Sequence, residues 1–289
     1  MININKLSRS YRLGQQEHIV LNKLDLRIEK GSFVAVLGRS GCGKSTLVKH
    51  INAILTPQSG SVSVDGMDTR DKSHIYDIRQ KAGMVFQDPD SQAVASIVED
   101  DVAFAPENLG LDEEEIKNRV EFALDAAGIS GLRNKSISTL SGGQKQLTAI
   151  AGILAMCPEY MIFDESTSML DPAARKRVID RVMRLRDELG IAVIWITHYM
   201  DEAVKADRVV IINKGSVAAD GTPEDVFADT ELIRECGLEL PPAAELCLRL
   251  MRADCPIPRL ALDIDDFADM LSGALAAAQE QREVINDRA

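Results

Sequence analysis

The sequence predicts an α/β protein with a mainly parallel sheet, and three observations carry that prediction. Residues 32–37 form a continuous apolar run, typical of a strand buried on both faces, which leads through a glycine-rich turn into a helical segment. Apolar runs return at 160–163, 193–196 and 208–212, with a predicted helix over 173–189 between the first two. Strands that alternate with helices favour a parallel sheet covered by helices. The 289 residues, 45% of them apolar and 27% charged, suffice for one large globular domain or two.

The N-terminal part of the chain predicts further strands. Residues 2–4 and 24–28 alternate apolar and polar side chains with the period of two that a half-buried strand requires. Residues 62–66 indicate another strand and a turn, and residues 45–51 indicate the helix after the glycine-rich turn. We therefore assign residues 1–87 and 160–224 to one core domain.

The stretch 88–159 has a different, helical character. Asp112 begins a helix whose first turn is acidic, as suits the positive end of the helix dipole, and Gly128 ends it. A second helical run covers 145–156. We interpret 88–159 as a helical subdomain inserted into the core.

The C-terminal part, 225–289, predicts a helical extension. Two segments each gather apolar side chains on one helical face, and prolines separate them. The two faces consist of Ala243, Leu246, Cys247, Leu250 and Met251, and of Phe267, Met270, Leu271, Ala274, Leu275 and Ala278. We expect the extension to pack on the core or on a second subunit.

Composition excludes several classes of function. The chain has 33 Lys and Arg against 45 Asp and Glu, a net charge of −12, which disfavours a nucleic-acid partner because phosphate backbones attract basic proteins. The most apolar short run, 191–196, is far below the roughly 20 residues that span a bilayer. The N-terminus lacks the apolar core of a secretory signal, and five scattered cysteines fit a reducing cytosol. Any role at a membrane must therefore come through a partner.

The clearest motif is a phosphate-binding loop of the pattern G-x-x-x-x-G-K-[ST], placed between a predicted strand and a predicted helix. Glycines let backbone N–H groups curl around a polyphosphate, and the helix directs its positive end at the anion. We expect Lys44 to neutralise the β- and γ-phosphates and the Ser45 hydroxyl to bind Mg²⁺. The residues of the loop are Gly38, Arg39, Ser40, Gly41, Cys42, Gly43, Lys44, Ser45 and Thr46.

Two carboxylates stand at the end of a later strand. Asp164 and Glu165 directly follow the apolar run 160–163, where α/β sheets hold their ligands. We expect Asp164 to hold Mg²⁺, directly or through water, and Glu165 to polarise the water that attacks the γ-phosphate. An acidic pair at a strand end is common by itself, so this interpretation depends on the phosphate loop.

A second anion-binding helix end is predicted at Ser141, Gly142, Gly143 and Gln144, which precede the helical run 145–156. One nucleotide does not need two such ends from one chain. We therefore expect this end to grip the γ-phosphate of a nucleotide held by another copy, although Ser-Gly-Gly alone is also an ordinary turn.

The phosphate loop, the Leu-Ser-Gly-Gly-Gln segment and the Asp-Glu strand, in this order, resemble ATP-binding cassette (ABC) ATPases over about residues 1–225. The resemblance implies the phosphate-loop nucleoside triphosphatase fold and hydrolysis of ATP. It also implies a head-to-tail pair of ATPases, in which each ATP lies between the phosphate loop of one copy and Ser141 of the other.

The same resemblance implies roles for residues outside these motifs. Tyr11 would stack on adenine, and Gln87 would sense Mg²⁺ and the membrane partner. The loop 168–171 would link the two ATP sites, and His198 would contact the γ-phosphate. Each residue alone also fits an ordinary role, such as a strand aromatic for Tyr11 or a helix cap for Asp171.

The segment 86–110 is similar to the ATPase subunits of energy-coupling factor (ECF) transporters, the importers of vitamins and of cobalt or nickel ions. The tail after residue 225 also fits that group, where it helps two ATPases associate. This resemblance implies a peripheral subunit on the cytoplasmic side of the cell membrane. Its implied partners are a second ATPase, identical or not, a transmembrane scaffold whose coupling helix enters a groove near Gln87, and a membrane subunit that selects the substrate.

Two positions depart from the pattern of the family. Leu147 stands where many members carry Arg after Gly-Gly-Gln-x-Gln, which puts that arginine's hydrogen bonds in doubt. Cys42 stands where Ser is frequent, after Gly41 in an electropositive loop, which predicts a favoured thiolate. We hypothesise that alkylation of this thiol inhibits the ATPase and that ATP protects it.

Three alternatives stay open at this point. The chain could serve another class of importer, with its own transmembrane partner. A cassette ATPase of DNA repair or translation would typically carry long coiled-coil insertions or two cassettes, whereas this chain has one phosphate loop. A non-catalytic regulatory cassette would require a damaged site, and none is evident in the sequence.

Overall fold

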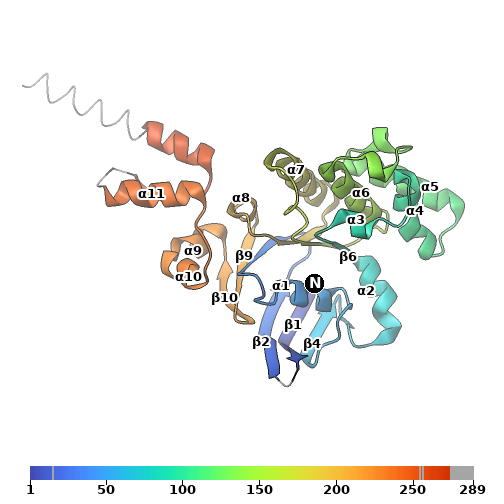
Figure 1. Cartoon of the computed structure of the whole chain (residues 1–289), viewed down its shortest axis with the longest axis horizontal. Coiled ribbons are helices and arrows are strands. Elements are labelled where there is room, and N and C mark those ends of the chain that lie inside the picture. Colours follow the sequence, from blue (N-terminus) through green and yellow to red (C-terminus); the bar gives the residue numbers. More distant parts are fainter. Residues whose placement is uncertain (15, 254, 256, 274–289) are drawn as a thin grey trace, which may run out of the picture.

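The centre of the molecule is a six-stranded sheet in the order β10-β9-β3-β8-β7-β6 (Figure 1). All neighbouring strands run parallel except β10, which pairs antiparallel with β9. The computed structural model describes residues 1–14, 16–253, 255 and 257–273. The strands of this sheet are β3 (Phe33–Leu37), β6 (Ala82–Val85), β7 (Tyr160–Asp164), β8 (Ala192–Ile196), β9 (Arg208–Asn213) and β10 (Ser216–Gly221).

A second, antiparallel sheet in the order β2-β1-β4-β5 lies below the first in Figure 1. Its strands are β1 (Ile2–Leu13), β2 (Gln16–Ile28), β4 (Ser59–Val64) and β5 (Met67–Asp68). The first two form one long hairpin that pairs Ile2 with Ile28 and still pairs Arg12 with Glu17. The alternation of apolar residues predicts only the end of this hairpin away from its turn, because toward the turn the buried Leu7 and Leu21 stand alone among polar and exposed residues.

Helices pack on both sides of the six-stranded sheet and continue into a lobe on the right of Figure 1. The lobe holds α3 (Pro89–Gln92), α4 (Val98–Asn108), α5 (Glu113–Ala127) and α6 (Gly142–Leu154). Asp112 caps α5 through a 2.9 Å bond from the Glu115 N–H, and Gly128 ends it at a left-handed φ of 72°, as predicted. The other helices of the core are α1 (Lys44–Ile51), α2 (Ile75–Lys81), α7 (Pro172–Leu189) and α8 (Met200–Ala203).

The six-stranded sheet separates two apolar cores. Val193 and Trp195 of β8 face α4 to α7, whereas Ile194 and Ile196 face α1 and the antiparallel sheet. This alternation is the period of two of a strand buried on both faces, as the apolar run predicts. The arrangement holds the carboxyl ends of the parallel strands at one edge, where the functional loops begin.

The C-terminal extension leaves the core after β10 and reaches to the upper left of Figure 1. It contains α9 (Pro223–Ala228), α10 (Thr230–Glu235), α11 (Pro242–Arg252) and a helix over 264–273. The last two form their own small core around Ala243, Cys247 and Phe267, whereas Leu246 is exposed rather than packed. The predicted positions Ala274, Leu275 and Ala278 lie outside the described residues.

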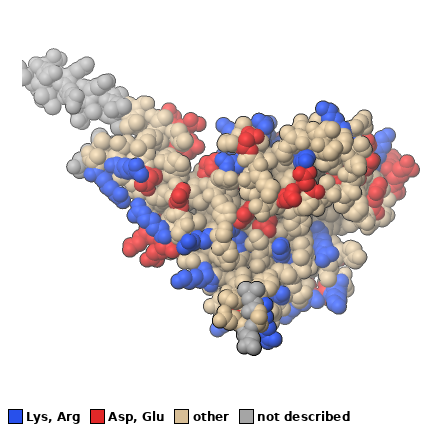
Figure 2. All heavy atoms as spheres, in the orientation of Figure 1, with Lys and Arg blue, Asp and Glu red and all other residues tan. Residues whose placement is uncertain are grey.

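No helix in the described part of the chain is both long and apolar enough to cross a membrane. On the face in Figure 2, lysines and arginines are interspersed with acidic residues. Acidic side chains gather at the right-hand end of the molecule in Figure 2. The first turn of α5 carries three acidic residues, Glu113, Glu114 and Glu115.

Candidate functional site

Three neighbouring strands bring the predicted catalytic residues to one edge of the sheet. The phosphate loop follows β3, His198 follows β8, and Glu165 follows β7, in the spatial order β3-β8-β7. Adjacent strands lie only about 4.8 Å apart, so residues remote in sequence become neighbours at this edge.

The glycines of the phosphate loop are required by close backbone contacts. A Cβ on Gly43, which has φ of 111°, would lie 2.8 Å from the Val20 carbonyl oxygen. A Cβ on Gly38 would lie 2.4 Å from the Ile212 carbonyl oxygen. Both distances are too short for a real side chain, so the packing of the loop against its neighbours requires glycine at these two positions.

Lys44 begins helix α1 and is almost completely buried. Its Nζ donates to the carbonyl oxygens of Gly38, at 2.8 Å, and Arg39, at 3.3 Å, and lies 3.6 Å from Glu165 Oε1. The ammonium group is therefore held inside the loop, beside the predicted catalytic carboxylate.

Ser45 and Asp164 form the predicted pair of metal ligands. The Ser45 hydroxyl donates to Asp164 Oδ1 over 2.8 Å. Burial raises the pKa of the Asp164 carboxyl above its ordinary value, and the bond from Ser45 partly offsets this effect. The site thus offers two neighbouring oxygen ligands, a hydroxyl and a largely buried carboxylate. Such ligands suit a hard divalent cation such as Mg²⁺.

Glu165 and His198 are in direct contact. The His198 Nε2 atom lies 2.6 Å from Glu165 Oε1, and it must donate because a carboxylate only accepts. Glu165 has a φ of 53°, a left-handed conformation that is uncommon for a residue other than glycine. Backbone strain of this kind is concentrated at functional sites.

A cavity of about 290 Å³ opens along the phosphate loop. Its lining residues are Val20, Ser40, Gly41, Gly43, Lys44, Ser45, Thr46 and Glu165. Most of the predicted phosphate-binding residues thus surround one space.

Cys42 does not line this cavity, and its predicted thiolate is wrong. Burial raises the pKa of the Cys42 thiol, and the smaller opposing effect of Lys44 does not overcome it. The thiol packs toward Gly38, where a Cβ would lie 2.6 Å from Sγ. The sequence shows the electropositive loop but not this burial.

Ser141, Gly142, Gly143 and Gln144 form the start of α6, away from the phosphate-loop cavity. Ser141 and Gln144 make a reciprocal capping box, in which the Gln144 N–H donates to Ser141 Oγ at 3.4 Å and the Ser141 N–H donates to Gln144 Oε1 at 3.0 Å. Ser141 and Gly142 are exposed, so this helix end is open to another molecule. Leu147 packs against the apolar core beneath it.

Two other predicted site residues, Gln87 and Tyr11, lie apart from the bonded residues of the phosphate loop and the catalytic pair. Gln87 is exposed, and its Nε2 donates to Ser168 Oγ over 3.2 Å. Tyr11 lies in β1, 37% exposed, with the Arg9 guanidinium 5.0 Å from the centre of its ring. Stacking of Tyr11 on adenine stays a prediction.

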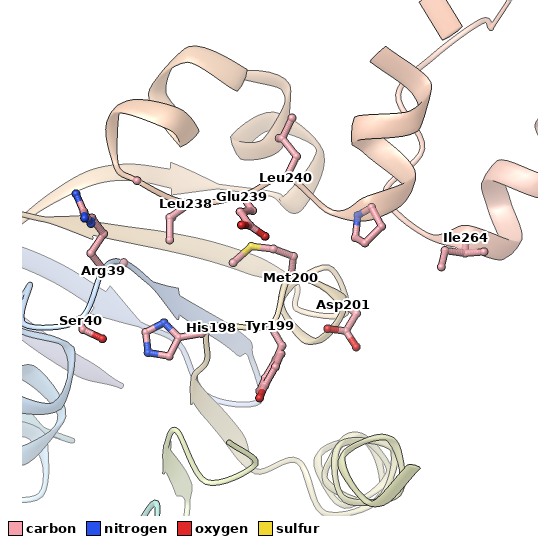
Figure 3. Close-up of a pocket in the computed structure, with 13 residues that line it drawn as sticks. Arg39, Ser40, His198, Tyr199, Met200, Asp201, Leu238, Glu239, Leu240 and Ile264 are labelled. Carbon is pink, nitrogen blue, oxygen red and sulfur yellow. The ribbon is translucent and has the colours of Figure 1, made fainter. Parts of the chain in front are cut away.

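A larger cavity of about 700 Å³ adjoins the phosphate loop and reaches the C-terminal extension (Figure 3). Arg39, Ser40 and His198 line one side, and Leu238 and Glu239 come from the extension. A Cβ on Gly237 would lie 2.5 Å from Arg39 Cδ. Sequence reasoning missed this contact between the extension and the phosphate loop, because nothing in the two segments signals their proximity.

Comparison with known proteins agrees with this geometry. The family model described as "ABC transporter" matches residues 21–168. The energy-coupling factor transporter ATP-binding protein of Symbiobacterium thermophilum is 49% identical, over 91% of this chain and 94% of that protein. The cobalt import ATP-binding protein CbiO of Syntrophus aciditrophicus is 43% identical, over 92% of this chain and 94% of that protein.

Solved structures agree as well. CbiO1 of Clostridium perfringens, described as part of the ABC transporter complex CbiONQ, superposes with a TM-score of 0.73 and 37% identity. That match covers 85% of this chain and 97% of CbiO1. A dimeric ATP-binding cassette in a post-hydrolysis state with ADP and Pi gives a TM-score of 0.69 and 28% identity, over 77% of this chain and 99% of that one.

The chain therefore belongs to the ABC transporter ATPases, and within them to the group of energy-coupling factor ATP-binding proteins. Members of this family hydrolyse ATP, so the predicted fold class and enzyme class are confirmed.

Proposed function

We propose that this chain binds ATP with Mg²⁺ and hydrolyses it to energise an importer of vitamins or transition-metal ions. It acts as one half of a head-to-tail ATPase pair, held by a transmembrane scaffold on the cytoplasmic side of the cell membrane beside a substrate-binding membrane subunit. The observation that carries this proposal is the connected set Lys44, Ser45, Asp164, Glu165 and His198 at one sheet edge. The names of the relatives support the class of importer.

The loop fits a polyphosphate because bare glycine backbone and the start of α1 surround the cavity. Ser45 and Asp164 supply the oxygen donors for Mg²⁺, and Gln87 adds a side-chain oxygen when its loop approaches. Bound Mg²⁺ supplies charge neutralisation and alignment of the phosphates.

Each catalytic side chain then has one task. Lys44 exchanges its carbonyl partners for phosphate oxygens and neutralises their charge. Glu165 orients the attacking water and accepts its proton, and His198 holds the Glu165 carboxylate and contacts the γ-phosphate.

The other half of the site comes from the second ATPase. The exposed start of α6, at Ser141 and Gly142, offers N–H groups and the positive end of a helix to the nucleotide of the opposite copy. In this account residues 1–87 and 160–224 form the nucleotide-binding core, 88–159 the subdomain that carries this end, and 225–289 the dimerisation extension.

Exposed apolar side chains in the segment that follows Gln87, residues 88–108, support docking of the scaffold. Val94 is 57% exposed and Phe104 is 47% exposed, which is unusual for large apolar side chains. The N–H of Val94 donates to Asp101 over 2.7 Å, which ties the loop of Val94 to α4, the helix that carries Phe104. A coupling helix with an apolar face fits these exposed side chains.

The test is Glu165→Gln in the full chain, purified with the partners that a tag on this chain retrieves from membranes. We expect ATP affinity to persist, because Lys44 and the loop remain, and turnover to fall by about 100-fold or more, because the water loses its base. The variant should accumulate a closed ATPase pair in size-exclusion chromatography with ATP. Turnover at the unaltered rate would remove Glu165 from this role.

A further inference from the structure

Glu202 is a buried carboxylate that the mechanism above does not use. It lies on the short helix α8 and is only 2% exposed. Thr167 Oγ1 donates to its Oε1 over 2.9 Å. Trp195 Nε1 and Thr197 Oγ1 donate to its Oε2 over 2.9 Å and 2.5 Å. All of these partners are neutral donors, so hydrogen bonds alone stabilise the carboxylate inside the protein.

The donors belong to the two segments that carry the catalytic pair. Thr167 comes two residues after Glu165, and Thr197 comes directly before His198. Thr197 Oγ1 also accepts from the N–H of Tyr199 over 3.0 Å, so this hydroxyl fixes the backbone on both sides of His198. One carboxylate therefore ties the loop after β7 to the loop after β8.

The backbone conformation of Glu165 requires support from neighbouring residues. Its φ of 53° is unfavourable for a residue with a Cβ, and such a conformation persists only where the surroundings determine it. The Glu165 N–H donates to the Ile196 carbonyl oxygen over 3.1 Å, which is a single backbone bond between the two loops. The bonds through Glu202 add a charge-assisted connection two residues further on, beside the bond from the Tyr199 hydroxyl to the Ser168 carbonyl oxygen over 3.5 Å.

We propose that Glu202 is a positioning residue for ATP hydrolysis: its buried carboxylate fixes the loops of Glu165 and His198 relative to each other, so that their 2.6 Å contact is made at the γ-phosphate. This inference rests on the proposed role of Glu165. Glu202 lines neither the phosphate-loop cavity nor the cavity beside it, so its loss should alter the catalytic step and not the binding of ATP.

The experiment compares Glu202→Gln and Thr167→Val with Thr69→Val in the complete transporter. Glutamine keeps the shape of the side chain but has one acceptor oxygen, so the three donors can no longer all be satisfied. We expect kcat to fall about tenfold in both site variants while the Kd for ATP changes less than about twofold, because a small misplacement of catalytic groups slows chemistry. Thr69 is a matched control, since it is equally buried and its hydroxyl has no partner in the described structure. Its variant should keep both values.

A spectroscopic readout accompanies the kinetics. Trp195 is the single tryptophan of the chain, and its indole N–H bonds Glu202 directly. The emission spectrum of the purified full chain, measured without its partners, should therefore change in Glu202→Gln and stay unchanged in Thr69→Val. Thermal unfolding of each variant reports whether it folds. If Glu202→Gln does not fold, Thr167→Val supplies the test.

The double variant decides between positioning and a separate effect. If Glu202 acts through Glu165, adding Glu202→Gln to Glu165→Gln should lower the residual rate by less than about twofold. An unchanged kcat in Glu202→Gln, a parallel loss of ATP binding and kcat, or the full tenfold loss on top of Glu165→Gln would overturn the proposal. Normal turnover by Glu165→Gln would instead overturn the proposed function of that residue.

Discussion

The polar side chains at the phosphate loop already satisfy one another. Lys44 bonds loop carbonyls, Ser45 bonds Asp164, and His198 bonds Glu165. A ligand that enters must replace these bonds with equivalent ones, because an unsatisfied buried polar group is costly. A triphosphate with a cation offers both the oxygens that Lys44 needs and the charge that Asp164 needs.

The half-buried thiol of Cys42 gives a prediction at the same scale. Because burial raises its pKa, little thiolate exists at neutral pH, and alkylation should be slow there and accelerate about tenfold per pH unit until the pKa is reached. Exposed Cys157 should react first at pH 7. Mass spectrometry of peptides after timed iodoacetamide treatment, with and without ATP, measures both rates. Modification of Cys42 before Cys157 at pH 7 would contradict the burial effect.

Residues that belong to a sequence motif can be predicted from the sequence. Residues whose partners become neighbours only in the folded chain cannot. Lys44, Ser45, Asp164 and Glu165 stand at fixed positions in recognisable patterns. Glu202 carries no such signal, because acidic residues at helix starts are common and its partners come together only when β7 and β8 pair. The burial of a group, and with it the direction of its pKa shift, likewise depends on side chains remote in sequence.

At the scale of elements, the cap at the start of α6 can be separated from the phosphate binding that we propose for the same helix end. Ser141→Ala removes the capping box and should lower the melting temperature by about 2–4 °C, as the loss of about 1 kcal/mol predicts. Ser141→Asp keeps a good cap and should keep the melting temperature, yet it places a negative charge against the phosphate of the opposite copy. Both variants should lose ATP hydrolysis, measured as phosphate release.

Asp112→Ala is the matched control for this comparison. Asp112 likewise caps its helix, α5, by accepting a hydrogen bond from the N–H three residues on, but that helix end carries no predicted ligand. The variant should lose a similar amount of stability and retain hydrolysis. If Asp112→Ala loses hydrolysis as Ser141→Ala does, the effect is one of stability and not of phosphate binding.

Elements with strong local signals are predicted well. The caps of α5 and the buried strands β3, β7, β8 and β9 are found within one or two residues. The β1–β2 hairpin is underestimated, and β10 is missed, because their exposed sides break the apolar pattern. Such strands are held by their neighbours and not by their own composition.

At the scale of the whole molecule, the C-terminal extension touches the phosphate loop. Gly237→Ala would force the Arg39 side chain away, because the new Cβ lies 2.5 Å from Cδ. We expect ATP affinity to weaken severalfold, since the Arg39 carbonyl is one of the groups that hold Lys44. Nucleotide titration measures the change. Gly110→Ala is the control, with φ of 71° against 65° at Gly237 and nothing within 4 Å of its Cβ; equal effects of the two variants would exclude the contact as the cause.

The exposed side chain of Phe104 on α4 gives a second prediction at this scale. Phe104→Glu should abolish co-purification of the transmembrane scaffold with the tagged chain, because a charge replaces an exposed apolar contact. Phe122→Glu alters a similarly exposed phenylalanine on α5 and should leave the complex intact. Loss of the scaffold in both variants, or in neither, would place the docking surface elsewhere.

The two-sided burial of β8 has a consequence for how this chain tolerates insertions. Ile194 and Ile196 fill one core while Val193 and Trp195 fill the other, so adding or deleting a single residue inside the strand would exchange the sides. The indole of Trp195 would then have to fit into the core position of an isoleucine, which is smaller. His198 would turn toward the opposite face of the sheet. Variation in length should therefore be confined to surface turns, and strand length fixes how far along the sheet each of the two catalytic loops begins.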